Sequence, residues 1–222
     1  MALVFCNLVI YPSSLLLRNV SFFGTIAVMG DNIIMKAWDW AKSINSSEIE
    51  DEYYCKTRDV FHGRLSTMVA VLVNSGKIPE NDAYMLAAIA GEIGNNSFDH
   101  NVGNWTDDAG VFFGYALSAA SQKNHLTIVL ADRGRGVLET LKRVKPELSN
   151  DEDALFVAFN EKISGRAPEP RGNGLKFVKE NIKGTEKHLL FVSGNGKIEI
   201  NEVTNITREA ERIQGCYTVI TI

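Results

Sequence analysis

The sequence predicts an α+β fold: a two-layer sandwich in which a mixed, mainly antiparallel sheet is covered on one face by helices. Two long segments, 56–75 and 81–101, repeat apolar residues at helical spacing. Later in the chain, short apolar runs bounded by turn residues, such as 126–130 and 188–193, indicate strands. The chain has 222 residues, which suits one large domain or one domain with an extension, and such a chain can bury a sizeable core.

The composition excludes several classes of function. Hydrophobic residues make up 45% and charged residues 23%, as in ordinary soluble globular proteins. The net charge of −4 offers no electrostatic attraction for nucleic acid. Cys6, Cys55 and Cys216 are scattered and lack the spacing of metal ligands, so a structural zinc site is not indicated. An odd number of isolated cysteines fits a reducing, cytoplasmic environment best.

The first residues are unusually apolar. Between residues 2 and 29 the only charged residue is Arg18. Polar residues and Pro12 divide this segment into runs too short to cross a bilayer, and no basic region precedes the first run, so stable membrane insertion is not expected. We expect two short strands instead, near 2–10 and 20–29, which could pair with each other or with a partner.

A helix is expected over 32–44, with Ile34, Trp38 and Ala41 on one face. It belongs with the preceding strands to an N-terminal extension, 1–55, that carries no motif. In the main domain, 56–222, we expect helices over 56–75, 81–101, 137–144, 152–163 and 172–183. The first of these helices should stop at Ser75-Gly76, and Asn150 or Asp151 should cap the fourth. Strands are expected over 111–117, 126–130, 188–193, 197–203 and 217–222, with a two-residue hairpin turn at Gly194-Asn-Gly196.

One stripe of the 81–101 helix changes from apolar to polar along its length. The helix is expected to be capped by Asn81 or Asp82 and to pack closely through small residues on its other side. Burying unpaired polar groups is costly, so the polar half needs a partner, and a metal-bound ligand would provide one. The alternative is that the last turns are simply solvated. The stripe consists of Met85, Ile89, Glu92, Asn96 and Asp99, with His100 at its edge.

Two glycine pairs occur at the ends of predicted elements, in Asp132-x-Gly134-x-Gly136 and in Gly172-x-Gly174-Leu175. A glycine pair between a strand and a helix lets backbone N–H groups approach a phosphate, although a tight turn is the commoner reason for a lone pair. The dinucleotide fingerprint, the P-loop and the nucleophile elbow are all missing from the sequence.

In this order and spacing, the polar helix and the two glycine pairs resemble the GHKL ATPase superfamily, which includes histidine kinases, anti-sigma-factor serine kinases, DNA gyrase, mismatch-repair ATPases and large heat-shock chaperones. The resemblance covers about 56–222 and implies a Bergerat-type ATP-binding fold. Glu92 to Asn96 with Asp99-His100 looks like the N box, and the Asp-His pair is closest to chemotaxis-type kinases. Asp132 to Gly136 looks like the G1 box, and Gly172 to Leu175 like the G2 box.

The resemblance implies a role for each box. Asn96 would give a neutral oxygen to Mg²⁺, and Glu92 would act as general base. Asp132 would accept a hydrogen bond from the adenine amino group, which favours adenine over guanine. Asp99 and His100 would lie among the nucleotide contacts.

The glycines and the lid complete the implied ATP site. Gly134 and Gly136 would let the chain pass close to the base, and Gly172 and Gly174 would present N–H groups to the phosphates ahead of Leu175. A lid would span about 137–171, with Arg166 and Arg171 as candidate phosphate contacts. Thr218 would close the adenine pocket, although the family places this Thr directly after a glycine and here the glycine is Gly215.

The resemblance leaves the reaction open. A free-standing domain suits an ATP-dependent serine or threonine kinase of the anti-sigma type, or a histidine-kinase-like catalytic domain, acting on a separate protein. The alternative is a non-catalytic module that binds ATP and engages a partner. An ATPase part of a larger machine would need a transducer domain that this chain lacks. His62 is a weak match to a phospho-acceptor histidine, and self-association as a homodimer is also open.

Overall fold

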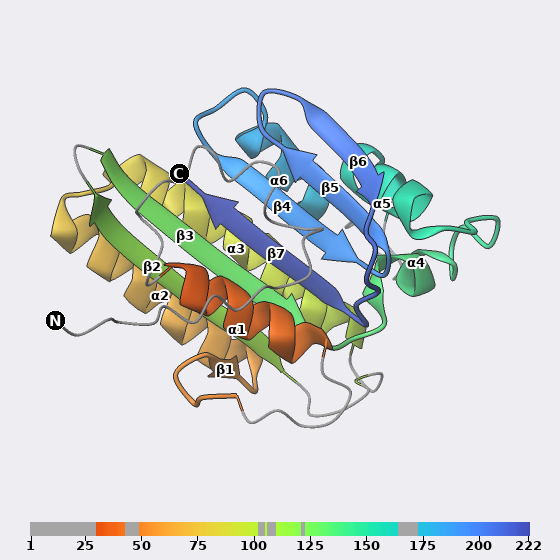
Figure 1. Ribbon diagram of the computed structural model, residues 1–222, viewed down its shortest axis with the longest axis horizontal. Helices are drawn as coiled ribbons and strands as arrows, with labels where there is room; N and C mark the ends of the chain where they lie inside the picture. Colours follow the sequence, from red (N-terminus) through yellow and green to blue (C-terminus); the bar gives the residue numbers. More distant parts are fainter. Residues whose placement is uncertain (1–29, 43–48, 102–104, 106–109, 121–122, 164–172) are drawn as a thin grey trace, which may run out of the picture.

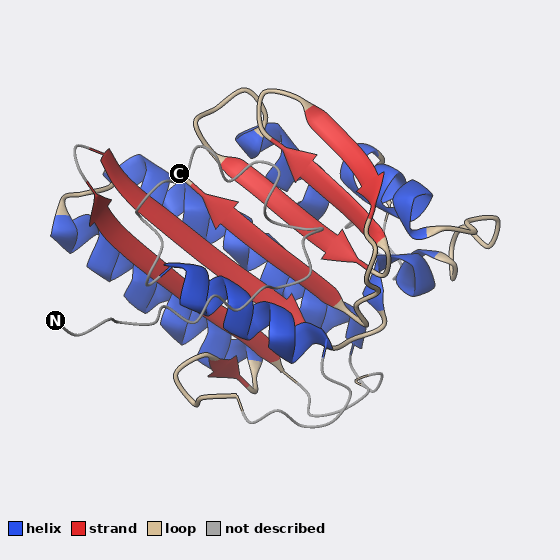
Figure 2. Cartoon of the chain, in the orientation of Figure 1, coloured by secondary structure: helices blue, strands red, loops and turns tan. Residues whose placement is uncertain are grey.

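The computed structural model describes residues 30–42, 49–101, 105, 110–120, 123–163 and 173–222. They form six helices and one seven-stranded sheet (Figures 1 and 2). The helices are α1 (Gly30–Lys42), α2 (Arg58–Ser75), α3 (Glu80–Asn101), α4 (Gly136–Leu141), α5 (Asp151–Asn160) and α6 (Gly174–Ile182). The strands are β1 (Tyr54–Cys55), β2 (Val111–Ala120), β3 (Lys123–Asp132), β4 (His188–Ser193), β5 (Gly196–Ile200), β6 (Thr204–Arg208) and β7 (Cys216–Thr221).

The sheet has the strand order β1-β2-β3-β7-β4-β5-β6, and every neighbouring pair is antiparallel. The predicted, mainly antiparallel sheet is therefore confirmed. The last strand in the chain, β7, lies in the middle, between β3 and β4. Its register sets Cys216 opposite both Asp132 of β3 and Ser193 of β4. The ends of these three strands thus meet at one place.

Helices α2, α3, α5 and α6 pack on one face of the sheet and enclose the main core, as predicted (Figure 1). The other face carries α1, which lies over β2, β3 and β7. The buried face of α1 differs from the predicted one, since Ile33, Ala37 and Trp40 are buried along with Ala41, whereas Ile34 and Trp38 are only half-buried. The predicted face was too narrow, because α1 lies on a sheet and residues at the sides of the helix also contact that sheet.

Several turns follow directly from the residues at element ends. Thr57 caps α2 by accepting a hydrogen bond from the Val60 N–H at 3.3 Å, and Gly76 ends that helix with a left-handed φ of 62°. Asn150 caps α5 by accepting from the Asp153 N–H at 2.7 Å. The β4–β5 hairpin has the predicted two-residue turn, since Ser193 pairs with Gly196.

Other predicted boundaries were wrong. Helix α3 starts at Glu80 after Pro79, and Asp82 does not cap it but forms an ion pair with Lys187 at 2.6 Å. The strand predicted over 197–203 ends at Ile200, where a turn leads into β6. Neither β6 nor the short β1 was predicted. The strands expected near 2–10 and 20–29 lie outside the described residues.

The close contact between α2 and α3 depends on the predicted small residues of α3. A Cβ built on Gly94 would lie 2.3 Å from a ring carbon of Phe61, so no side chain fits there. Phe61 is fully buried and also packs edge-on against Phe113 of β2. Within the described ranges, none of the helices combines the length and apolar character that crossing a bilayer would require.

Candidate functional site

A cavity of about 620 Å³ opens between α3 on one side and α4, α5 and α6 on the other. Strand ends of β3, β4 and β7 contribute Asp132, Phe191 and Cys216 to its wall. Eight residues singled out from the sequence line this cavity: Glu92, Asn96, Asp99, His100, Asp132, Gly136, Gly174 and Leu175. Their segments lie far apart in the chain, and the fold brings them together.

Asp132 is a deeply buried part of the cavity wall, with 2% of its surface exposed. Its carboxylate accepts hydrogen bonds from the Ser97 hydroxyl at 2.6 Å and the Gly134 N–H at 2.8 Å, and a longer one from the Asn101 amide at 3.4 Å. Burial raises the pKa of Asp132 above its ordinary value, and these hydrogen bonds oppose the rise. The side chain is therefore an acceptor held in one orientation.

The turn after Asp132 is fixed by neighbours on other elements. Gly136 has a φ of 76°, which few other residues adopt, and a Cβ there would lie 2.8 Å from the Ser193 hydroxyl oxygen. That hydroxyl accepts from the Val137 N–H at 2.9 Å, while Asn101 accepts from the Arg135 N–H at 3.0 Å. Gly134 lies beside the cavity, and its contribution is the N–H donated to Asp132.

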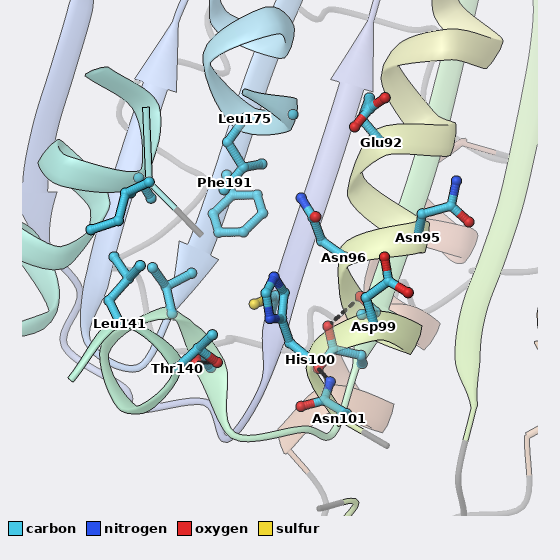
Figure 3. Close-up of a pocket in the computed structure, with 18 of the residues that line it drawn as sticks. Glu92, Asn95, Asn96, Asp99, His100, Asn101, Thr140, Leu141, Leu175 and Phe191 are labelled. Carbon is cyan, nitrogen blue, oxygen red and sulfur yellow. Dashed lines mark hydrogen bonds between the residues drawn. The ribbon is translucent and has the colours of Figure 1, made fainter. Parts of the chain in front are cut away.

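At the other end of the cavity, α6 begins beside the polar stripe of α3. A Cβ built on Gly174 would lie 2.6 Å from Glu92 Oε2 and 3.5 Å from Asn96 Nδ2. Glu92 is exposed and Asn96 half-buried. Helix N-termini carry partial positive charge, so this start of α6 favours negative groups near it. Asn96 and His100 point from α3 toward Leu175 and Phe191 across the cavity (Figure 3).

The wall opposite α3 is largely apolar. Leu141 of α4, Leu175 of α6 and Phe191 of β4 lie on this side, with Thr140 as a polar member (Figure 3). The ring of Phe191 packs edge-on against Phe159, with 5.3 Å between the ring centroids. The cavity therefore pairs a polar wall with an apolar one, as small-molecule sites commonly do.

Two polar contacts join α2 to α3 at the cavity edge. Arg58 forms an ion pair with Asp99, and both residues line the cavity. One helical turn away, four residues later in α2 and four residues earlier in α3, His62 Nε2 lies 2.9 Å from Asn95 Oδ1. His62 is exposed, so the structure gives it a contact with the cavity edge as well as access to solvent.

Thr218 is not among the described residues that line the cavity. It is buried on β7 between Leu130 and Phe191, and its hydroxyl oxygen has no hydrogen-bond partner within the described part of the chain. Cys216, which directly follows Gly215, lines the cavity instead. Burial raises the pKa of the Cys216 thiol well above its ordinary value, and the nearby Asp132 adds to the rise. Arg166, Arg171 and Gly172 lie outside the described residues.

The predicted lid is partly built into the core. Leu155 and Phe159 of α5 are fully buried in the main core. Asp151 accepts from the Asn195 N–H at 3.0 Å and forms an ion pair with Arg212 at 2.9 Å, which ties α5 to the β4–β5 turn. A movement that opens the cavity would therefore have to leave α5 in place.

Sequence reasoning missed several residues of the site. Ser97 and Asn101, which hold Asp132, are one turn apart on α3, and this spacing was the only available signal. Arg58, Asn95 and Phe191 gave no local signal, because their position depends on which helices and strands become neighbours.

Comparisons with protein families, with curated proteins and with solved structures found no match. In the described residues, no group of three or more His, Cys, Asp or Glu side chains is arranged to hold a metal ion.

Proposed function

We propose that the chain binds a magnesium adenine nucleotide in this cavity and uses it as a GHKL-type ATPase or protein kinase. One observation carries the proposal. Residues chosen from sequence as parts of the N, G1 and G2 boxes, separated by up to 83 positions between Glu92 and Leu175, line a single cavity. Its volume of about 620 Å³ lies in the usual range for small-molecule sites.

The Asp132 end suits the base of the nucleotide. Asp132 is an oriented acceptor, so it can take a hydrogen bond from the adenine amino group, whereas guanine has a carbonyl at the corresponding edge. The apolar side chains of Leu141 and Phe191 would cover the faces of the ring.

The Glu92 end suits the phosphates. The N-terminus of α6 at Gly174 would donate backbone N–H groups to phosphate oxygens. Asn96 would hold Mg²⁺ through its amide oxygen. Since no larger group of ligating side chains is present among the described residues, phosphate and water would complete the coordination. The bound ion would offset the charge of the phosphates.

The position of Glu92 supports a role in proton transfer. It lies one turn before Asn96 on α3 and is exposed, so a hydroxyl group or a water molecule can reach it from solvent. Taking the proton from that attacking group would make Glu92 the general base. A kinase would receive the hydroxyl from a separate protein, and an ATPase would receive water. The free thiols of Cys55 and Cys216 fit our expectation that this happens in the cytoplasm.

The alternative is a module that binds ATP and engages a partner without turnover. Its support is the anchoring of α5, which restricts closure over the nucleotide. Transfer of labelled γ-phosphate distinguishes the possibilities: label on a partner protein indicates a kinase, free phosphate an ATPase, and neither a binding module.

Calorimetry with ATP and GTP in the presence of Mg²⁺ tests the proposal itself. We expect ATP to bind more tightly than GTP, and Asp132→Asn to weaken ATP while the domain stays folded. Equal affinity for ATP and GTP, or no binding of either, would contradict the proposal.

A further inference from the structure

Among the described residues, the wall of the cavity carries more negative than positive charge. Three carboxylate side chains, Glu92, Asp99 and Asp132, belong to its wall. Arg58 is the one lysine or arginine among the described residues that line it. A ligand carrying several negative charges would be repelled unless a cation of the protein or of the solution faces it.

Arg58 is placed to be that cation. It is the first residue of α2, directly after the Thr57 cap, so its backbone is fixed by the helix start. Its side chain is 42% exposed, whereas that of Asp99 is only 16% exposed. The guanidinium therefore reaches the cavity from its rim while Asp99 holds it from the wall.

The ion pair leaves most of the guanidinium available. Arg58 donates through Nη2 to Asp99 Oδ1. Within the described part of the chain, the structure records no other hydrogen bond or ion pair for Arg58. A guanidinium has several N–H donors in a rigid fork that matches phosphate geometry, so the remaining donors can bind a phosphate while Asp99 stays in place.

The surrounding contacts keep Arg58 in position. His62 and Asn95 make a second polar contact between α2 and α3, one turn away. Beneath the two contacts, Phe61 fills the space above Gly94 and lies 6.1 Å from Phe98, measured between ring centroids. The start of α2 cannot shift without disturbing this packing, so Arg58 approaches the cavity from a rigid base.

We propose that Arg58 is a phosphate-binding residue of this cavity, oriented by Asp99, and that it makes the site prefer a nucleoside polyphosphate to a nucleoside. The inference rests on the proposed nucleotide binding and adds to it a residue outside the N, G1 and G2 boxes. Asp99 is a positioning residue, because it acts on the ligand through Arg58.

The experiment compares ATP with adenosine, since adenosine has the same base and ribose without phosphates. Affinities are measured by calorimetry for the parent, Arg58→Gln and Lys56→Gln. Lys56→Gln is the matched control, because it removes the same charge two positions away from an exposed side chain outside the cavity wall. We expect Arg58→Gln to weaken ATP about 10- to 100-fold, as for a lost charge-assisted hydrogen bond, and to leave adenosine unchanged.

A second pair of variants tests the orienting role of Asp99. Asp99→Leu removes the acceptor and should weaken ATP without weakening adenosine. Asp99→Asn retains an oxygen that accepts from Arg58, so it should restore ATP affinity. A purely structural role of Asp99 would instead change both ligands together. The dependence of ATP affinity on salt concentration should also flatten in Arg58→Gln and remain in Lys56→Gln.

The outcomes separate this inference from the proposed function. If the parent prefers ATP to adenosine and Arg58→Gln retains that preference in full, the role of Arg58 is wrong while nucleotide binding stands. The role is also wrong if Arg58→Gln weakens both ligands equally. If the parent binds neither ATP nor adenosine, the proposed function is wrong and the inference fails with it.

Discussion

The two ends of the cavity differ in how strongly the fold holds them. Asp132 is 2% exposed and receives hydrogen bonds from α3 and from its own turn, whereas Glu92 is an exposed side chain on the same helix α3. The Asp132 end is therefore part of the packed structure, while the Glu92 end is free to respond to a ligand. In the proposed function, base recognition is built into the fold and the chemistry lies at its surface. Substitutions at the two ends should affect different properties.

The largest effect is expected from Glu92→Gln, which retains the size of the side chain and removes its basicity. Turnover should fall about 100-fold, which is the lower end of the range for a positioned general base. The lower end is expected because phosphoryl transfer depends more on positioning and charge than on the base. Single-turnover kinetics with ATP measures the loss, and calorimetry should give an ATP affinity close to that of the parent. Unchanged turnover would remove Glu92 from the chemistry.

The next effect should appear in stability at the other end. Asp132→Ala removes the acceptor of the buried Gly134 N–H and the shorter hydrogen bond of the Ser97 hydroxyl, so the free energy of unfolding should fall by about 2 kcal/mol. Glu92→Ala is the matched control and should change it by no more than about 0.5 kcal/mol. Urea denaturation measures both variants. Similar losses would show that the two ends do not differ.

Titration should sharpen the contrast further. Because burial raises the pKa of Asp132 in the folded protein, the folded state holds a proton that the unfolded state releases. This contribution to stability is complete below the ordinary carboxyl pKa and is lost as the pH rises through the raised pKa. Unfolding free energies of the parent minus those of Asp132→Asn, measured across this window, should decrease with rising pH. A flat or increasing difference would contradict the assignment.

The smallest effect is expected where α6 meets Glu92. In Gly174→Ala the new methyl group would meet Glu92 Oε2, the end of a flexible side chain that can move aside. Alanine favours the helix, so stability should rise by about 0.5 kcal/mol. Turnover should fall, but by less than in Glu92→Gln, because Glu92 is displaced and still present. Thermal unfolding and a turnover assay test the two parts, and a drop in stability would indicate that the contact is rigid.

Local signals in the sequence predicted most of the elements. Gly76 was predicted as a helix stop and Asn150 as a helix cap, and both act within a few residues through their own backbone or side chain. Long-range partners could not be predicted. Asp82 looked like a helix cap, but Lys187, 105 positions away, is its partner.

In the candidate site, too, local signals could be predicted from the sequence and long-range neighbours could not. Glu92, Asn96 and Asp99 were found because helical spacing alone puts them on one stripe. The resemblance to a known family contributed Asp132 and the glycines. Arg58 could be found only after α2 was seen beside the end of α3. Cys216 carries no local signal, because its place opposite Asp132 depends on the register between β3 and β7.

The central place of β7 has a consequence for how the protein is made. On the ribosome, β2 and β3 can pair as soon as they emerge, and β4 to β6 can pair later, but among the described strands only β7 (Cys216–Thr221) connects the two groups into one sheet. Until then the edges of β3 and β4 that β7 will join are unpaired and can pair with other chains. The cavity also lacks Cys216 until that moment. Assembly of the sheet and completion of the cavity wall should therefore coincide, once β7 has been synthesised.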